Sequence, residues 1–131
     1  MNEFCNPPLL AKPNGFTHVV KSTGSTVIYV SGQVSYNSDG EIVGVGDLPT
    51  QVHQVYQNIA TALSAYGASM RNVVKTTIFV CDLTPQKIAI IRQVRAGFLS
   101  EESPPASTMV GVQALAKPEL MLEVEAIAVM P

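Results

Sequence analysis

The chain has 131 residues and a mass of 14.0 kDa, which is the size of one domain, so residues 1–131 are predicted to form a single domain. Hydrophobic residues make up 47% of the sequence and charged residues 14%, a balance that excludes intrinsic disorder. No apolar run approaches the roughly 20 residues that cross a bilayer, and no leader-like segment opens the chain. We therefore expect a cytoplasmic protein without a membrane partner.

The charge pattern argues against nucleic-acid and metal binding. Eight Lys and Arg residues stand against ten Asp and Glu residues, and the cations are scattered rather than gathered on one face. Cys5 and Cys81 are isolated, and His18 and His53 form no ligand pair, so neither a metal site nor a disulfide framework is predicted. No cofactor is expected. A charged fraction of 14% is low for a small monomer, which favours a homo-oligomer whose copies cover part of the surface.

The first part of the chain predicts a strand and a hairpin. Residues 1–15 are rich in Pro, Asn and Gly and are predicted to form an irregular arm. The segment Val27–Val34 is nearly continuous in β-branched residues, which predicts a well-buried strand. Turn-forming residues at 37–40 then lead into residues 41–43, the expected return strand of a hairpin.

Two helices are predicted in the middle of the chain. Asp47 is the expected N-cap of the first, which has an uncharged polar face and an apolar stripe: Gln51, Gln54, Gln57, Asn58 and Thr61 against Val52, Tyr56, Ile59, Leu63 and Tyr66. His53 lies beside this stripe, where a packed, hydrogen-bonded histidine is favoured over a catalytic one. Thr84-Pro85 marks the start of the second helix, whose buried stripe is Ile88, Ile91, Val94 or Arg95, and Phe98.

Three further strands complete the prediction: Val73–Cys81 between the helices, then Ala106–Val112 and Leu120–Met130. The economical arrangement of these elements is an α+β fold, with one mixed sheet and both helices packed on one face. The opposite face of the sheet would then be apolar and uncovered. Such a face requires a partner surface, in agreement with the low charge.

Three features could carry chemistry. Ser31-Gly32-Gln33 interrupts the first strand; a β-bulge is the favoured interpretation and a ligand site the alternative. Glu123 and Glu125 lie on one face of an otherwise apolar strand, where they are either solvated or available for general acid–base work. Pro105-Ala106-Ser107-Thr108 places hydroxyl groups at the start of a strand.

Three segments together resemble the RidA/YjgF family of small enamine and imine deaminases: Tyr29–Gln33, Val74–Leu83 and Glu123–Ala128. Their order and spacing follow the family, and the likeness extends from Gly15 to Pro131. The resemblance implies a chorismate-mutase-like fold and a homotrimer whose sheets face inward as a barrel. Ligand clefts would then lie between neighbouring subunits.

The same resemblance implies the site residues. The family holds the substrate carboxylate with an arginine in a Pro-Ala-Arg-Ser motif, and Ser107 stands at that position here. Glu123 matches the glutamate that places the attacking water. The ligand, a small imine, enamine or related organic acid, would be lined by Ser31, Gly32, Ser107, Thr17, Met109 and Arg92. Arg92 would substitute for the missing cation or, in the favoured interpretation, remain solvated on the helix.

Three functions remain open at this point. The first is water-mediated hydrolysis of a C=N bond, with an atypical substrate because Ser107 lacks a guanidinium group. The second is binding or sensing of a small metabolite without turnover. The third, a ribonuclease or translation inhibitor, is the least favoured because the chain is acidic and has no basic stripe.

Overall fold

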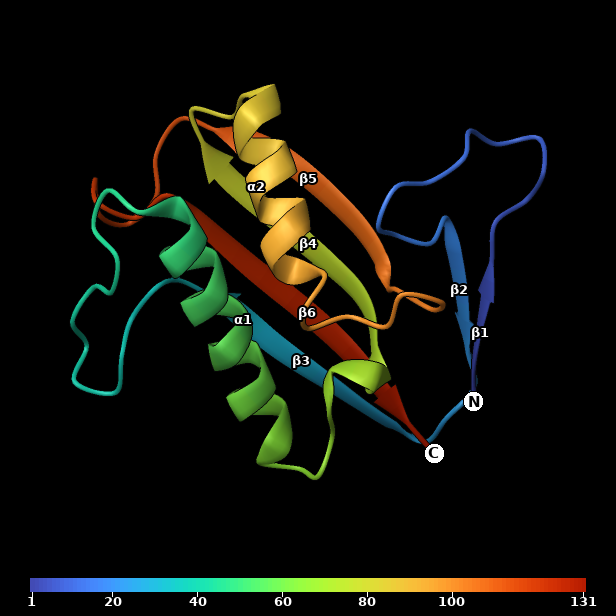
Figure 1. Cartoon of the computed structure of the whole chain (residues 1–131). Helices are drawn as coiled ribbons and strands as arrows, with labels where there is room; N and C mark the ends of the chain where they lie inside the picture. Colours follow the sequence, from blue (N-terminus) through green and yellow to red (C-terminus); the bar gives the residue numbers. More distant parts are fainter.

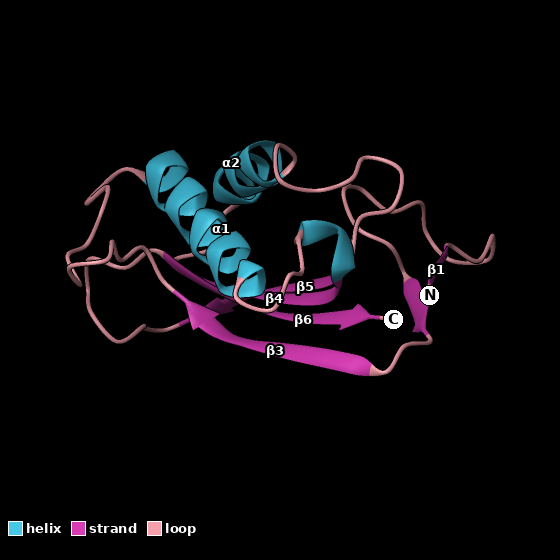
Figure 2. Ribbon diagram, turned by 90° about the horizontal axis from the view of Figure 1, so that it is seen from below, coloured by secondary structure: helices cyan, strands magenta, loops and turns pink.

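A four-stranded mixed sheet forms the centre of the computed structural model, which describes residues 1–131 (Figure 1). Its strand order is β3-β6-β4-β5, and β6 runs antiparallel to both neighbours while β5 runs parallel to β4. Both α-helices lie on one face of this sheet (Figure 2). The α+β prediction is confirmed. The elements are β3 (Thr26–Gln33), α1 (Leu48–Ser64), the 3-10 helix η1 (Met70–Asn72), β4 (Val73–Cys81), α2 (Pro85–Arg95), β5 (Ala106–Val112) and β6 (Leu122–Met130).

The helix side of the sheet carries most of its buried residues. In β6 the even-numbered residues from Leu122 to Ala128 pack under the helices, whereas Glu123 and Glu125 project from the other face. The continuous burial expected for Val27–Val34 is wrong, because this strand alternates too. Ile28 is buried, but Tyr29 is 76% exposed. The sheet therefore has one open face, as the sequence predicted.

Helix α1 begins where the sequence predicted. Asp47 caps it by accepting a hydrogen bond from the backbone N–H of Thr50 at 3.2 Å, and Pro49 occupies the first turn. The helix ends at Ser64, so the placement of Tyr66 on its apolar stripe is wrong. Tyr66 follows the helix and is 75% exposed.

Gln51 is fully buried, which corrects its expected place on the polar face of α1. Its amide nitrogen donates to the carbonyl oxygens of Gly44 at 3.0 Å and Glu119 at 2.9 Å. Its amide oxygen accepts from the backbone N–H of Met121 at 2.9 Å. One side chain thus joins the loop before α1 to the segment that leads into β6.

Helix α2 buries Arg95 rather than Val94, which resolves the alternative that its spacing left open. Phe98 follows the helix and lies against two rings of α1, with centroids 5.2 Å from His53 and 5.6 Å from Tyr56. His53 is therefore packed as expected, although it is exposed on its other side and the structure shows no hydrogen bond from its side chain. These aromatic contacts hold the two helices together.

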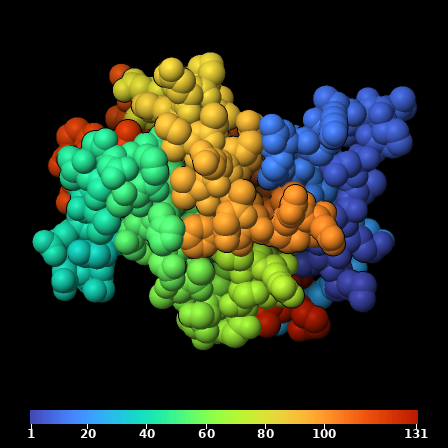
Figure 3. All heavy atoms as spheres, viewed as in Figure 1, coloured from blue at the N-terminus to red at the C-terminus, as the bar shows by residue number.

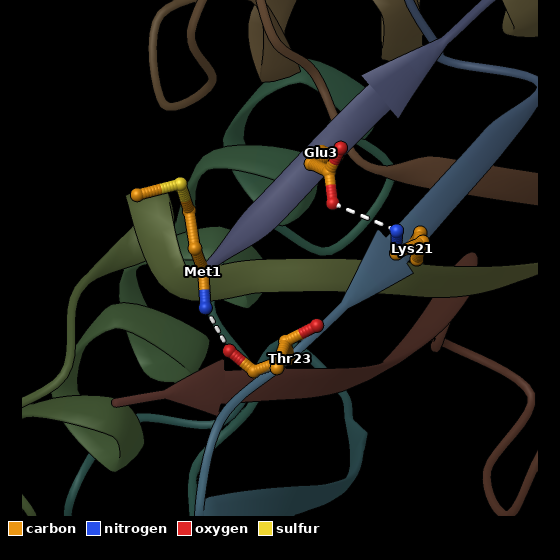
Figure 4. A network of polar contacts seen from close by, with 4 residues as sticks. All are labelled: Met1, Glu3, Lys21 and Thr23. Atoms are coloured by element: carbon orange, nitrogen blue, oxygen red, sulfur yellow. Dashed lines mark hydrogen bonds and ion pairs between the residues drawn. The ribbon is translucent and has the colours of Figure 1, made fainter.

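The irregular arm predicted for residues 1–15 is wrong at its start, whereas residues 6–15 form an irregular loop. Asn2–Cys5 (β1) pairs with Val19–Ser22 (β2) in a separate antiparallel ribbon. The loop between them reaches the residues that follow α2 (Figure 3). Glu3 and Lys21 form an ion pair at 3.1 Å, and the Met1 amino group donates to the Thr23 carbonyl oxygen (Figure 4).

The expected return strand at residues 41–43 is also wrong. A single bridge between Tyr36 and Ile42 is the only ladder contact there. The turn itself forms, because the Asn37 side chain accepts from the backbone N–H groups of Asp39 and Glu41, each at 3.0 Å. No helix in the chain combines the length and the hydrophobicity that crossing a bilayer requires.

Candidate functional site

A β-bulge at Ser31 and Gly32 shapes the open face of the sheet. Val30 pairs with Ala126 and Gln33 with Val124, so two residues of β3 lie opposite one residue of β6. The bulge interpretation of Ser31-Gly32-Gln33 is confirmed. It leaves the ligand-site interpretation open, because bulges often redirect the backbone beside a site.

Glu123 lies directly against this bulge. A Cβ atom on Gly32 would be 2.7 Å from Glu123 Cδ and 2.9 Å from its Cγ, both far too close, so only glycine leaves room for the carboxylate. Glu123 is half-buried and takes part in no ion pair. The arrangement presents an uncommitted carboxylate beside a kinked backbone, a geometry suited to holding a water molecule.

Glu125 shares the face but not the position of Glu123. It is exposed and lies opposite Thr77 of β4, whereas Glu123 lies opposite Phe79. Glu125 lines a shallow hollow of about 210 Å³ together with Ser31, and Glu123 is not part of its lining. The two carboxylates are therefore neighbours on one strand that meet different surroundings.

Ser107 and Met109 point to the opposite face. They lie in register with Thr76 and Ile78, two buried residues on the helix side of β4. The Thr76 hydroxyl donates to the Ser107 hydroxyl oxygen at 3.1 Å, and Met109 packs against the core. Ser107 is half-buried and makes a neutral contact with Thr76, so it presents no charge at this position.

Thr17 is buried and held by the backbone before β5. Its N–H donates to the Pro105 carbonyl oxygen at 3.1 Å, and its hydroxyl donates to the carbonyl oxygen of Pro104. The hydroxyl of Thr17 is therefore committed to a structural hydrogen bond. Its contribution is to fasten the segment around Gly15 against the start of β5.

Arg92 is half-buried and lines a pocket of about 500 Å³ at the C-terminal end of α2, so it is less exposed than the solvated-helix interpretation expected. The same pocket contains Arg95, which the helical spacing offered as the alternative to Val94 on the buried stripe of α2. Arg95 contacts Tyr56, whose burial raises the pKa of its hydroxyl to about 12 even though the Arg95 charge acts in the opposite direction. An arginine at a core position of a helical repeat is the signal that could have identified it.

The predicted site residues thus fall into two groups on opposite sides of the sheet. Ser31, Gly32 and Glu123 belong to the open face, and the other residues belong to the helix side: Thr17, Ser107, Met109 and Arg92. A single chain does not bring the two groups together. No group of three or more His, Cys, Asp and Glu side chains is arranged to hold a metal ion.

Comparison with known proteins identifies a matching family model and related sequences. Residues 9–130 match the family model described as Endoribonuclease L-PSP. The chain is 32% identical over 122 residues to 3-aminoacrylate deaminase RutC of Acinetobacter baylyi, covering 93% of this chain and 90% of the relative.

Solved structures agree over the whole chain. The crystal structure of YyfB, a Rid-family protein of unknown function from Yersinia pestis, superimposes with a TM-score of 0.92 at 36% identity and covers 98% of both chains. The structure of E. coli TdcF with bound serine gives a TM-score of 0.71 at 27% identity, with 92% of this chain and 97% of that chain covered. The predicted fold is the one these proteins share.

Proposed function

The chain belongs to the endoribonuclease L-PSP family, which includes the RidA/YjgF proteins, and we propose that it deaminates a small imine or enamine metabolite by hydrolysis. The ligand would bind in clefts between the subunits of a homotrimer. The observation that carries this proposal is the uncommitted carboxylate of Glu123, set against the Gly32 bulge. The similarity to a 3-aminoacrylate deaminase supports the reaction class.

The proposed chemistry needs one water molecule and one carboxylate. Glu123 accepts a proton from the water as the water oxygen bonds to the C=N carbon, and it returns that proton to the substrate nitrogen, which gives a carbinolamine. The hydroxyl proton of the carbinolamine then passes through Glu123 to the amine, and ammonia leaves as the C=O bond forms. Ser31 and Gly32 would line the reacting end of the ligand, since their backbone is displaced beside Glu123.

A trimer would complete the site. The open sheet face exposes Val27 by 47%, Tyr29 by 76% and Val110 by 38%, a set of large apolar side chains that water solvates poorly. Because the two groups of site residues lie on opposite sides of the sheet, a cleft that contains both requires two chains. A solution mass three times the 14.0 kDa of the chain is expected from light scattering at micromolar concentration.

The substrate would differ from an ordinary amino-acid-derived imine. A guanidinium group binds a carboxylate through two charge-assisted hydrogen bonds, whereas Ser107 offers a neutral hydroxyl that already contacts Thr76. The loss of such a contact weakens carboxylate binding by roughly tenfold to a thousandfold unless another cation replaces it.

Ammonia release from freshly generated 2-iminobutanoate tests the proposal. We expect Glu123→Gln to lower the enzymatic rate by roughly 10²-fold or more, the usual range for loss of a general base. Glu125→Gln is the matched control, because it removes a carboxylate from the same strand and face. Equal rates above the uncatalysed background for wild type and Glu123→Gln would overturn the role of Glu123, and background rates in both would remove 2-iminobutanoate as a substrate.

Binding without turnover is the second candidate, and the neutral Ser107 favours it. A ligand that copurifies and stays unchanged on long incubation would support this function, and steady conversion of that ligand would refute it. The ribonuclease activity in the family description has no support from charge, since acidic residues outnumber basic ones by ten to eight. The cytoplasmic location stays a prediction.

A further inference from the structure

Arg92 and Arg95 are two neighbouring cations without an anionic partner. They lie three residues apart in α2 and therefore on the same side of the helix. Arg95 is only 4% exposed, and the Nε atoms of both side chains are buried without a hydrogen-bond partner. The single ion pair of the chain joins Lys21 to Glu3. Unpaired buried charge is costly, so a pair of this kind indicates an absent anion.

The loop around Gly15 borders the pocket beside these arginines and is held in place. Gly15 adopts a positive φ of 81°, and a Cβ atom there would lie 3.2 Å from Arg95 Nη2 and 3.5 Å from Arg92 Cγ. Thr17 fastens this loop to the backbone at Pro104 and Pro105. The N-terminal loop and the residues after α2 lie side by side in Figure 3. A space of about 500 Å³ remains, which is enough for a small metabolite.

The pocket carries net positive charge. Burial lowers the pKa of Arg95, Tyr56 opposes this effect, and the neighbouring charge of Arg92 lowers the pKa further. An arginine nevertheless stays protonated near neutral pH. Glu101 is the one carboxylate that lines the pocket, and it pairs with neither arginine within 4.0 Å. Two cations and one anion leave a single positive charge, which a monoanion would neutralise.

We propose that Arg92 and Arg95 form a binding site for the carboxylate of a small organic acid. The pocket supplies from α2 the charge that Ser107 lacks on β5. The inference deepens the proposed function and rests on it for the ligand class, a 2-imino or 2-oxo acid. Because the sheet separates the pocket from Glu123 of the same chain, binding here can be measured apart from turnover.

The test is calorimetric titration of the full chain with 2-oxobutanoate, the stable product expected from 2-iminobutanoate, and with its neutral amide. We expect saturable binding of the acid, and Arg92→Gln and Arg95→Gln should each weaken it by roughly tenfold or more. Arg71→Gln is the matched control, since it removes an exposed arginine outside the pocket and should leave affinity unchanged. Arg92 is only half-buried, so its variant tests the site even if Arg95→Gln does not fold.

Three results would overturn the inference: no saturable binding of the acid by the wild type up to about 10 mM, binding of the amide as tight as that of the acid, or unchanged affinity in Arg92→Gln. Failure of the pocket and failure of the proposed function are distinguishable. Turnover that depends on Glu123 without dependence on Arg92 would leave the deaminase proposal intact and refute the pocket. Binding that depends on Arg92 in a protein without turnover would support the pocket and refute the deaminase proposal.

Discussion

Gly32→Ala should remove activity while leaving the fold intact. The new Cβ would lie 2.7 Å from Glu123 Cδ, so the carboxylate must move by roughly 0.7 Å or more to reach an ordinary 3.4 Å contact. A misplacement of about 1 Å in a catalytic group can cost on the order of 10²-fold in rate. Gly32 does not have a positive φ, so alanine introduces no backbone strain. The Glu123 side chain can change rotamer at about 0.5–1.5 kcal/mol, partly offset by the lower chain entropy of alanine.

The assay combines ammonia release with urea unfolding. We expect the rate for 2-iminobutanoate to fall by roughly 10²-fold, close to the loss in Glu123→Gln, while the free energy of unfolding changes by about 1 kcal/mol or less. Gly97→Ala is the matched control, because its nearest contact would be an ordinary 3.5 Å. Full activity in Gly32→Ala would refute the idea that the rate depends on the position of Glu123. An equal loss of rate in Gly97→Ala would refute it too.

Two further predictions concern stability. Gln51→Ala leaves backbone groups at Gly44, Glu119 and Met121 without their part-buried hydrogen bonds and should lower the free energy of unfolding by about 2–4 kcal/mol in urea titrations. The exposed Gln57→Ala should change it by about 0.5 kcal/mol at most. A loss under about 1 kcal/mol in Gln51→Ala would contradict the three-way role of this side chain. Burial raises the pKa of Tyr56 from 10.0 to about 12, so between these pH values the folded state keeps a proton that the unfolded state loses. The contribution of Tyr56 to the free energy of unfolding is therefore fully present below pH 10.0 and declines toward about pH 12. Unfolding measured at several pH values in this window should show a decline of up to about 1.4 kcal/mol per pH unit in the wild type and a flatter profile in Tyr56→Phe; parallel profiles would exclude Tyr56 as the cause.

The central elements were predictable because their signals are local. The bounds of β4 and β5 agree with the predicted Val73–Cys81 and Ala106–Val112, since β-branched residues and flanking turns mark both strands. Asp47 and Thr84 each cap a helix through a side-chain hydrogen bond at 3.2 Å to a backbone N–H, as the sequence indicated. Each of these features depends on residues only a few positions apart.

The features that the sequence did not reveal depend on distant contacts. Asn2–Cys5 forms a strand because it pairs with Val19–Ser22, and nothing in its own composition predicts that partner. Gln51 resembles any other residue of a polar helix face until three backbone groups converge on it. In both cases tertiary hydrogen bonding, rather than propensity, decides the outcome.

The candidate site shows the same division between local and distant information. Alternation along β6 placed Glu123 on the open face, but the side of the sheet that Ser107 faces follows only from the parallel register of β5 on β4. That register puts Ser107 next to Thr76 on the helix side of the sheet, where the serine is half-buried and its hydroxyl accepts a neutral hydrogen bond. The cations available on this side of the sheet are instead Arg92 and Arg95 in α2, which face a pocket and lack an anionic partner. Under the proposed arrangement, charges on the helix would take the place of a charge on the strand, which would keep recognition of an acid and change the shape of ligand that fits. For this reason we expect the substrate to differ from that of relatives that keep the arginine, even if the reaction at Glu123 is the same.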